Sequence, residues 1–218
     1  AELGADLVVE SATKYLAGHS DVMAGVVVGG RDAVAGVRAV QVDSGASLAP
    51  LAAFLVLRSL PTLAIRMERH SATAAALAAW LERQEGVVRV YHPSLGSHPQ
   101  QETARRQLAA GGGMLAMELA GGRAAGRAFL DALTLTERTA SLGSVHTIVV
   151  HPPSTTHRQL DEAALMAAGI APGLLRVSVG LEDLDDLRAD VAQALAVARS
   201  AGGREPVAST SPAAAAHG

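Results

Sequence analysis

The sequence predicts an α/β chain in two parts that are joined by a long helix. Two short apolar runs, at residues 6–10 and 24–30, lack strict alternation of apolar and polar residues, as is typical of strands covered on both faces. A helical period starts near Ser47 and continues beyond Pro61. From residue 111 onwards, short strands and helices alternate. We therefore expect an α/β piece, then a long linking helix, and then a small α+β domain.

The two predicted helices that follow Ser47 each carry one apolar face. In the first helix, one side is formed by Leu51, Phe54, Leu55 and Arg58. Pro61 interrupts the helical pattern, because a proline ring clashes with the preceding turn. The longer second helix has a stripe formed by Ile65, Ala72, Ala76, Leu77, Trp80 and Leu81. We expect this stripe to face the core of the protein.

Strand and helix patterns also divide the rest of the chain. Strands are expected at residues 86–93, 111–122, 145–153 and 173–180. Helices are expected at residues 123–133 and 160–169, followed by a closing helix marked by Leu184, Leu187, Val191, Leu195 and Ala198. Gly169 is expected to end the second of these helices, because glycine readily adopts the left-handed conformation found there.

Domain boundaries follow from these patterns. Residues 1–62 are expected to be the remaining part of a larger α/β domain, and residues 63–202 the linking helix with the small domain. Residues 203–218 lack periodicity and are rich in Pro, Ser, Thr and Gly, which is typical of a disordered tail. The chain also reaches a strand pattern within five residues of Ala1, so we expect it to be the later part of a longer sequence.

Composition and charge argue against several classes of partner. The 18 basic and 21 acidic residues give a net charge of −3 without a sustained basic run, which gives nucleic-acid phosphates little to bind. The lack of cysteine excludes disulfides and thiol catalysis, and suits a cytoplasmic protein. We find neither a signal peptide nor an apolar stretch near the ~20 residues of a bilayer span. These features predict a cytoplasmic protein that binds neither nucleic acid nor membrane.

A lysine lies in the short polar turn between the first two predicted strands. Ser11 and Thr13 precede Lys14, and in an extended segment their hydroxyls would point to the same side. Such a group is suited to an aldehyde that also carries a phosphate, since the amine can form a Schiff base and the hydroxyls can bind the anion. An ordinary solvated loop has the same residues, so the turn alone leaves both interpretations open.

Six ordered segments of the sequence resemble one family of enzymes. They are SATKYLAGHSDVMAG, LPTLAIRMERHSATAAALAAWLE, YHPSLGSHPQ, GGGMLAMEL, ASLGSVHTIVVHPPSTTH and GIAPGLLRVSVGLEDLDDLRADVAQAL. Together they are similar, in order and spacing over about residues 1–198, to the Cys/Met-metabolism enzymes that depend on pyridoxal 5'-phosphate (PLP). These include cystathionine γ-synthase, cystathionine γ-lyase, methionine γ-lyase and homoserine-ester sulfhydrylases. The resemblance implies the C-terminal part of a fold type I (aspartate aminotransferase-like) large domain, followed by the family's small domain.

The resemblance also implies roles for particular residues. Lys14 matches the lysine that binds PLP and carries protons, and Ser11 and Thr13 match ligands of the cofactor phosphate. Arg176 matches the arginine that binds the substrate α-carboxylate, and Ser141 matches a residue lining that carboxylate site. Without the resemblance, Arg176 would be interpreted as a strand arginine paired with a surface acid. The family further implies an amino-acid substrate and a homo-oligomer, a dimer of dimers.

Two departures from the family affect the expected activity. Ala140 stands where members that act on cystathionine often carry a glutamate, which makes the chain more similar to methionine γ-lyases or sulfhydrylases. In the family, an aspartate paired with the pyridinium nitrogen, a tyrosine stacked on the ring and a glycine-rich phosphate turn precede the lysine, and this sequence lacks them. We therefore expect a PLP-dependent lyase or transferase that is inactive as this fragment alone. A γ-replacement sulfhydrylase and a non-catalytic remnant are the alternatives.

Other polar clusters have simpler interpretations than a ligand site. His146, His151 and His157 are close in sequence, but a strand followed by a loop with no nearby acidic cluster is poor for a closed metal site, so no metal is expected. The glycines at 111–113 are not followed by the Lys-Ser/Thr of a phosphate-binding loop, and they predict a turn before a strand.

Overall fold

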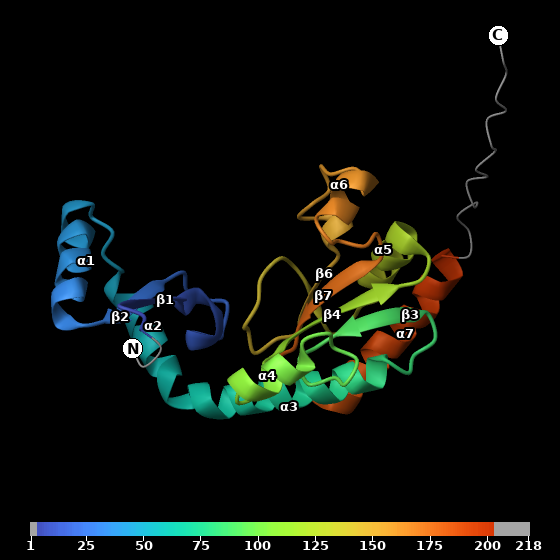
Figure 1. The fold of residues 1–218 in the computed structure, drawn as a ribbon, viewed down its shortest axis with the longest axis horizontal. Helices are drawn as coiled ribbons and strands as arrows, with labels where there is room; N and C mark the ends of the chain where they lie inside the picture. The colour runs from blue at the N-terminus through green and yellow to red at the C-terminus, as the bar shows by residue number, and fades with distance from the viewer. Residues whose placement is uncertain (1–3, 203–218) are drawn as a thin grey trace, which may run out of the picture.

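The computed structural model describes residues 4–202, and the predicted tail at 203–218 lies outside the described residues. We call residues 4–62 the N-terminal segment and residues 63–202 the C-terminal segment. Figure 1 shows the two segments side by side, joined along one edge by the long helix α3 (Leu63–Leu81). This arrangement of a small α/β piece, a linking helix and an α+β region is the one that the sequence predicts.

The N-terminal segment consists of a two-stranded hairpin and two helices. Strands β1 (Leu7–Ser11) and β2 (Gly25–Gly29) pair antiparallel, with Val9 opposite Val27. Between them the chain forms one short helical turn, Ala12–Leu16, which we call the lysine turn. The helices are α1 (Arg31–Asp43) and α2 (Pro50–Ser59).

The prediction that these two strands are covered on both faces is wrong. All five residues of β1 are exposed, and Val9 retains 72% of its accessible surface. Helix α1 was not predicted, and none of its residues is buried. The apolar pattern of the strands is real, but within residues 4–202 no residue of β1 or β2 is buried.

Helix α3 turns a different face to the core than its apolar residues predicted. A 3₁₀ turn at Leu60–Thr62 joins it to α2, where Pro61 marks the predicted interruption. Leu77 and Leu81 are buried as expected, but Ile65 is 65% exposed. In the first half of the helix the buried face is polar, since Arg66 and His70 are 5% and 0% exposed. The predicted face is therefore correct at the end of the helix, at Leu77 and Leu81, and wrong at its beginning, where Arg66 and His70 are buried instead of Ile65.

The C-terminal segment contains a five-stranded sheet in the order β3-β4-β7-β6-β5. Its strands are β3 (Val87–Tyr91), β4 (Met114–Leu119), β5 (Glu137–Arg138), β6 (Ile148–Val150) and β7 (Leu174–Ser178). Only the β5–β6 pair in this sheet is parallel, and the other three pairs are antiparallel. The four longer strands fall in the predicted ranges, whereas the two-residue β5 was not predicted.

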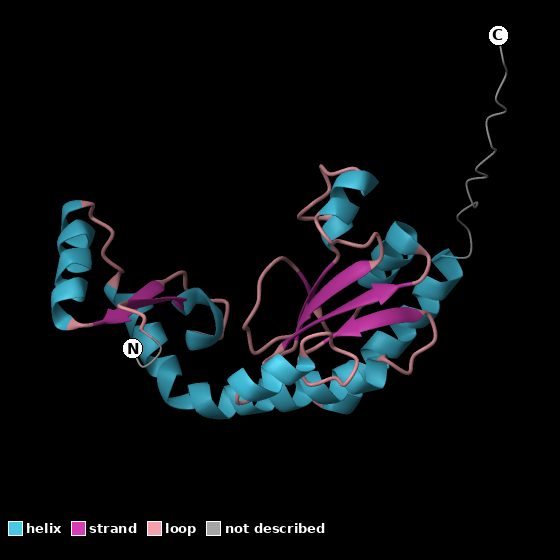
Figure 2. Cartoon of the chain, in the orientation of Figure 1, coloured by secondary structure: helices cyan, strands magenta, loops and turns pink. Residues whose placement is uncertain are grey.

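Besides α3, the C-terminal segment contains four helices around the sheet (Figure 2). They are α4 (Gln101–Gln107), α5 (Gly122–Ala132), α6 (Glu162–Ala167) and α7 (Leu184–Gly202). Side chains of α3, α5 and α7 join those of the strands in one hydrophobic core. Helix α4 was not predicted. Gly169 ends α6 with a φ of +71°, as expected for a left-handed cap.

The core sheet has two chemically different faces. Along β7, Leu175 and Val177 are buried in the core, so Arg176 between them points to the opposite face. There it is paired in register with Ala116 on one side and Val150 on the other. The alternation thus places a cation on the face of the sheet that the core helices do not cover.

One continuous helical stretch, Pro50–Leu81, is long and apolar enough to cross a membrane by length and composition alone. The sequence pattern predicted two separate helices here, so no apolar stretch of this length was expected. Its second half contributes Ala74, Leu77 and Leu81 to the core. Its first half carries exposed apolar residues, among them Leu51 and Phe54. Of the apolar window within this stretch, 11% is buried, so the finding rests on length and composition only.

Candidate functional site

The lysine turn has a kinked backbone at its centre. Lys14 has a non-helical conformation (φ −85°, ψ −129°), while the amide N–H groups of Ala17 and Gly18 donate to the carbonyls of Ala12 and Lys14 at 2.9 and 2.7 Å. The turn is therefore closed by hydrogen bonds on both sides of the lysine. Gly18, with a φ of +76°, lets the chain reverse immediately afterwards.

Lys14 meets two residues from distant parts of the sequence. Its Nζ donates a hydrogen bond to Ser141 Oγ at 3.0 Å. Arg176 Nη2 donates to the backbone carbonyl of the same Ser141 at 2.9 Å. Ser141 thus connects the lysine of the N-terminal segment to the arginine of β7. The structure brings together three of the five residues that the sequence analysis selected.

The guanidinium of Arg176 is available to a ligand. The residue is half-buried on the uncovered face of the sheet, and within residues 4–202 no carboxylate forms an ion pair with it. This arrangement does not support the alternative of a strand arginine neutralised by a surface acid. A planar guanidinium can bind a carboxylate through two parallel hydrogen bonds. Arg176 can therefore accept an anion close to Ser141.

Loop residues of the C-terminal segment press closely on the lysine turn. A Cβ atom on Gly143 would lie 2.6 Å from the amide nitrogen of Tyr15 and 3.0 Å from the carbonyl carbon of Lys14. The amide N–H of Val145 donates to the carbonyl of Gly18 at 2.8 Å. Glycine at position 143 is therefore required for this approach, because any side chain would push the loop away from the turn.

The extended conformation expected over Ser11 and Thr13 is wrong, because a helical turn begins between them at Ala12. The chain leaves the strand conformation at Ala12. Ser11 lines a hollow of about 440 Å³ together with Lys14, whereas Thr13 lines a second hollow of about 390 Å³ together with Ser141. The helical turn between the two hydroxyls is the physical reason for their separation.

The hydroxyl of Thr13 is already engaged with the hairpin. Its Oγ1 accepts from the amide N–H of Ala24 at 2.9 Å and donates to the carbonyl of Ala24 at 3.3 Å. The second hydrogen bond is long and therefore weak. The proton of this hydroxyl can turn to an incoming anion at small cost.

The larger of these hollows is mainly apolar. Besides Ser11 and Lys14 it is lined by Tyr15, Leu16, Leu63, Met67, Leu142 and Glu10. Burial raises the pKa of the Tyr15 phenol, and the nearby Ser178 hydroxyl opposes this effect in part. The Tyr15 ring also packs edge-on against the His70 ring, with 5.4 Å between the ring centroids. One wall of the lysine site is therefore fixed by aromatic packing.

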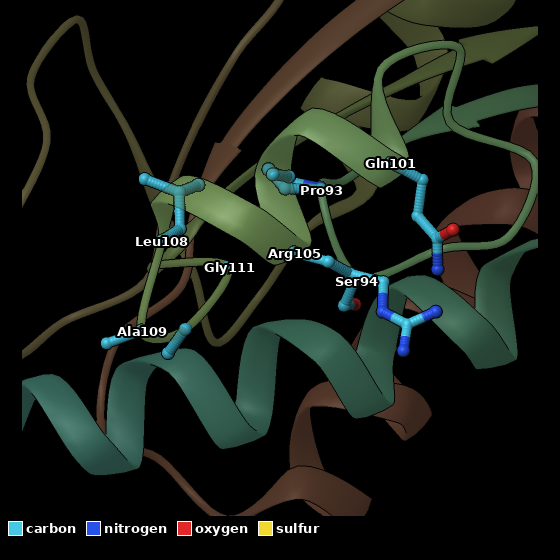
Figure 3. A pocket seen from close by; sticks show the side chains of 9 residues that line it. Pro93, Ser94, Gln101, Arg105, Leu108, Ala109 and Gly111 are labelled. Atoms are coloured by element: carbon cyan, nitrogen blue, oxygen red, sulfur yellow. The ribbon is translucent and has the colours of Figure 1, made fainter.

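A third hollow, of about 380 Å³, has no residue of the lysine turn in its lining. Figure 3 shows it from close by. Arg105 and Gln101 project from α4 beside Ser94, which follows β3. Arg105 is the one charged residue among those that line it, and no further cluster of reactive groups accompanies it. Nor does any group of three His, Asp or Glu side chains within residues 4–202 come together to hold a metal ion. The lysine site is thus the place where chemically useful groups converge.

Lys14 is the only lysine among the 218 residues, and the other 17 basic residues are arginines. An arginine guanidinium stays protonated and does not react with aldehydes under ordinary conditions, whereas a lysine amine can lose its proton. The single side-chain amine of the whole chain is therefore located at the point that Ser141 and Arg176 approach.

Comparison with known proteins identifies the family. Residues 1–196 match the family model of the Cys/Met metabolism PLP-dependent enzymes. The chain belongs to this family. It is 50% identical to the L-methionine gamma-lyase of Pseudomonas putida and 47% identical to the O-succinylhomoserine sulfhydrylase of Pseudomonas aeruginosa, covering 89% of this chain in both cases.

Solved structures confirm the predicted fold class. The cystathionine gamma synthase of Xanthomonas oryzae pv. oryzae in complex with cystathionine superposes with a TM-score of 0.85 at 41% identity, covering 92% of this chain and 52% of that one. The curated relatives named above are covered over 49% and 48% of their own length. The chain thus spans about half the length of the proteins that it matches, and its fold is that of their PLP-dependent class.

The residues of the lysine site fit the cofactor of this family in part. A free amine, a hydroxyl on the same hollow and an available guanidinium are the groups that an aldehyde, a phosphate and a carboxylate require. Arg66, which contacts the lysine turn from α3, was missed by the sequence analysis. The spacing could have indicated it, because Arg66 lies four residues before His70 and eleven before Leu77, on the buried side of the helix.

Proposed function

We propose that this chain is the part of a PLP-dependent enzyme that supplies the reactive lysine and the substrate-carboxylate site, acting on a sulfur-containing or γ-substituted amino acid. The observation that supports it most is the connection of Lys14 and Arg176 through Ser141, across 127 and 35 residues of sequence. We propose Lys14 as the residue that binds PLP, with Ser11 and Thr13 as ligands of its phosphate. The boundary near residue 62 then separates the cofactor part from the domain that carries the carboxylate site.

Each residue has a distinct task in this proposal. Arg176 binds the α-carboxylate through two hydrogen bonds and so fixes the orientation of the bond from Cα to its hydrogen. Lys14 Nζ accepts the proton from Cα, and Ser141 Oγ holds the amine within reach of that atom. Bound PLP supplies the electron sink that makes the loss of this proton possible. Lys14 then returns a proton to the carbon skeleton.

The two curated relatives named above suggest two reactions, elimination and replacement. A methionine γ-lyase type of enzyme eliminates the γ-substituent, and a sulfhydrylase type replaces it with sulfide. Ala140 adds no carboxylate next to Ser141, so the site offers no partner there for a second amino group. We propose γ-elimination, supported by the 50% identity to the methionine gamma-lyase, with γ-replacement on an acylated homoserine as the second candidate, supported by the 47% identity to the sulfhydrylase.

We further propose that residues 1–218 alone lack activity and require a further polypeptide segment that supplies the partner of the pyridinium nitrogen. Without such an acid the ring nitrogen is not kept protonated, and the electron sink is weaker. The exposed apolar side chains of β1 and α2 provide a surface for that polypeptide. A homo-oligomer in the cytoplasm is part of the same proposal.

Covalent labelling tests the proposed role of Lys14. The purified chain is incubated with PLP, reduced with borohydride and digested for mass spectrometry. The ε-amine and the aldehyde condense with loss of water, and the hydride reduces the C=N bond, so a phosphopyridoxyl group should appear on the peptide containing Lys14. The α-amino group of Ala1 serves as the internal reference for non-specific labelling. A Lys14 label no stronger than that at Ala1 would contradict the assignment.

Activity requires a second experiment. The chain is co-expressed with the part of the Pseudomonas putida methionine gamma-lyase that precedes its matched region. Release of a thiol from L-methionine would support elimination, and consumption of O-succinylhomoserine with sulfide would support replacement. A complex that binds PLP but performs neither reaction would identify the chain as a non-catalytic remnant. Lys14→Arg is the control, since it keeps the charge and removes the reactive amine.

A further inference from the structure

Arg66 is a buried cation that has no acidic partner among residues 4–202. Its side chain instead makes four hydrogen bonds. Nη1 donates to the carbonyl of Tyr15 at 2.7 Å, and Nη2 donates to the carbonyls of Leu16 and Ser59 at 3.2 and 3.1 Å. Nε donates to Thr62 Oγ1 at 3.1 Å. Since burying a charge is costly, the surrounding acceptors must be held in place to compensate for it.

These acceptors belong to two helix ends. Ser59 is the last residue of α2, and Tyr15 and Leu16 are the last residues of the lysine turn. Carbonyl groups at the end of a helix carry partial negative charge and lack a partner within the helix, so a guanidinium is well suited to bind them. Arg66 therefore ties the residues that directly follow Lys14 to α2 and α3.

The lysine turn is enclosed from two sides. On one side the loop of Ser141 and Gly143 lies against Lys14 and Tyr15. On the other side Arg66 binds the carbonyls, and a Cβ atom on Gly18 would collide with its guanidinium. The two sets of contacts together confine the turn between the loop of Ser141 and Gly143 and helix α3.

We propose that Arg66 is a positioning residue that holds Lys14 Nζ at Ser141 and thereby sets the reactivity of the amine. This inference rests on the proposed function of Lys14. Arg66 touches neither the amine nor the carboxylate site, and it acts through the backbone of Tyr15 and Leu16. A lysine at position 66 would not replace it, because an ammonium lacks the planar fork that binds several acceptors at once.

The single lysine gives this proposal a direct spectroscopic test. Chain grown with ¹³C-labelled lysine gives NMR signals from one side chain only, so the Cε signal reports the environment of Lys14. We expect one sharp signal in the wild type, and a shifted or split signal in Arg66→Gln. Arg69→Gln is the matched control, since Arg69 is an exposed arginine on the same helix. Its signal should stay at the wild-type position.

Labelling by PLP gives the second measurement. We expect Lys14 to be labelled about tenfold more slowly in Arg66→Gln, since a misplacement of ~1 Å at a reacting group costs up to about a hundredfold. Leu187→Ala is the control for lost stability, because Leu187 is fully buried in the core far from the turn in sequence. Measured at a temperature where both variants are folded, it should leave the labelling rate within about twofold of wild type.

The outcomes separate this inference from the proposed function. An Arg66→Gln variant with the wild-type Lys14 signal and labelling rate would overturn the inference, as would equal changes in Leu187→Ala. If wild-type Lys14 is not labelled, the proposed function fails, and the NMR comparison still decides whether Arg66 positions the side chain. If Arg66→Gln does not fold, Thr62→Val decides. This variant removes the acceptor of Arg66 Nε and also the hydrogen bond from Thr62 Oγ1 to the carbonyl of Ser59, so both contacts that hold the guanidinium near Thr62 change, and an unchanged Lys14 signal in it would also overturn the inference.

Discussion

The two segments of the chain differ in how far their apolar side chains are buried. In the C-terminal segment Phe129, Leu77 and Leu187 are at most 1% exposed. In the N-terminal segment Val9 and Phe54 are 72% and 58% exposed. The sequence offers apolar residues to both, but only the C-terminal segment closes a core among residues 4–202. Its stability therefore comes from burial, whereas the N-terminal segment depends on its attachments.

Those attachments are concentrated at the lysine turn. The hydrogen bond from Val145 to Gly18, the loop of Gly143 and the guanidinium of Arg66 all contact this short stretch. The candidate site thus lies where the C-terminal segment, which has its own core, contacts the N-terminal segment, which has none among residues 4–202. The amine proposed to react, that of Lys14, comes from the N-terminal segment, and the group proposed to bind substrate, Arg176, comes from the C-terminal segment.

The two phenylalanines of the sequence, Phe129 and Phe54, provide the strongest test of this contrast. Phe129→Ala removes a fully buried ring, and we expect it to lower the free energy of unfolding by about 3–5 kcal/mol. Phe54→Ala removes an exposed ring, and the free energy of unfolding should change by no more than about 0.5 kcal/mol. Urea unfolding followed by circular dichroism measures both. A large loss in Phe54→Ala would show that α2 is covered in solution.

The sequence predicts the structure well where apolar side chains are buried against other residues of the same chain. Helix α5 falls almost entirely in the range predicted at residues 123–133, and the strand containing Arg176 was found by its apolar pattern. In these elements the apolar residues pack against other parts of the same chain, so their spacing in the sequence predicts the type of the element.

The sequence was less informative where a contact is made by polar atoms. Arg66 was missed, because a pattern of apolar residues gives no weight to a guanidinium that binds carbonyls. The extended conformation expected over Ser11 and Thr13 was wrong, since the chain becomes helical at Ala12. The meeting of Lys14 with Ser141 was expected only through the family resemblance, as a separation of 127 residues leaves no local signal.

Asp190 provides a second, smaller test within the C-terminal segment. Burial alone would raise the pKa of this carboxyl, but hydrogen bonds from the backbone N–H and hydroxyl of Thr134 and from the N–H of Leu135 outweigh it, and the pKa is lowered. The ionised form therefore stabilises the fold above about pH 4, and this contribution is lost as the pH falls through the lowered pKa.

We expect Asp190→Asn to lower the free energy of unfolding at pH 7 by about 1.5–3 kcal/mol, the usual range for hydrogen bonds to a charged group. Asp131→Asn is the matched control. Asp131 is 64% exposed and paired with Arg127 at 3.8 Å, and removing such a pair should change the free energy by no more than about 0.5 kcal/mol. Equal losses in the two variants, measured by urea unfolding, would mean that the hydrogen bonds to Asp190 add no stability.

Three buried histidines make the C-terminal segment sensitive to acid. Burial lowers the pKa of His70, His92 and His151, each of which is 0% exposed. The unfolded chain therefore binds more protons than the folded one below about pH 6.5, so stability falls as the pH decreases through that value. Each histidine adds a slope of at most about 1.4 kcal/mol per pH unit.

His92 is suited to testing this slope. Its Nδ1 accepts the amide N–H of Ser94 at 3.2 Å, so the ring is neutral, with the proton on Nε2 directed at the carbonyl of Gly112. We expect His92→Gln to make the fall in stability between pH 6.5 and 5 shallower, as measured by thermal unfolding at several pH values. His146→Gln, at an exposed position, should leave the slope unchanged. A slope unaffected by His92→Gln would contradict the neutral, buried ring.

The smallest expected change in stability occurs at the boundary of the two segments. Ser141→Ala removes one hydrogen bond at a half-buried position, so the free energy of unfolding should fall by no more than about 1 kcal/mol. The Cε signal of Lys14 should nevertheless move, because the amine loses its acceptor. Thr139→Val, at an exposed position two residues upstream, should change neither quantity. A Lys14 signal unchanged by Ser141→Ala would mean that the amine does not rest on Ser141 in solution. Stability and reactivity are thus expected to separate at this boundary, since Val145 and Arg66 hold the turn in place without the serine hydroxyl.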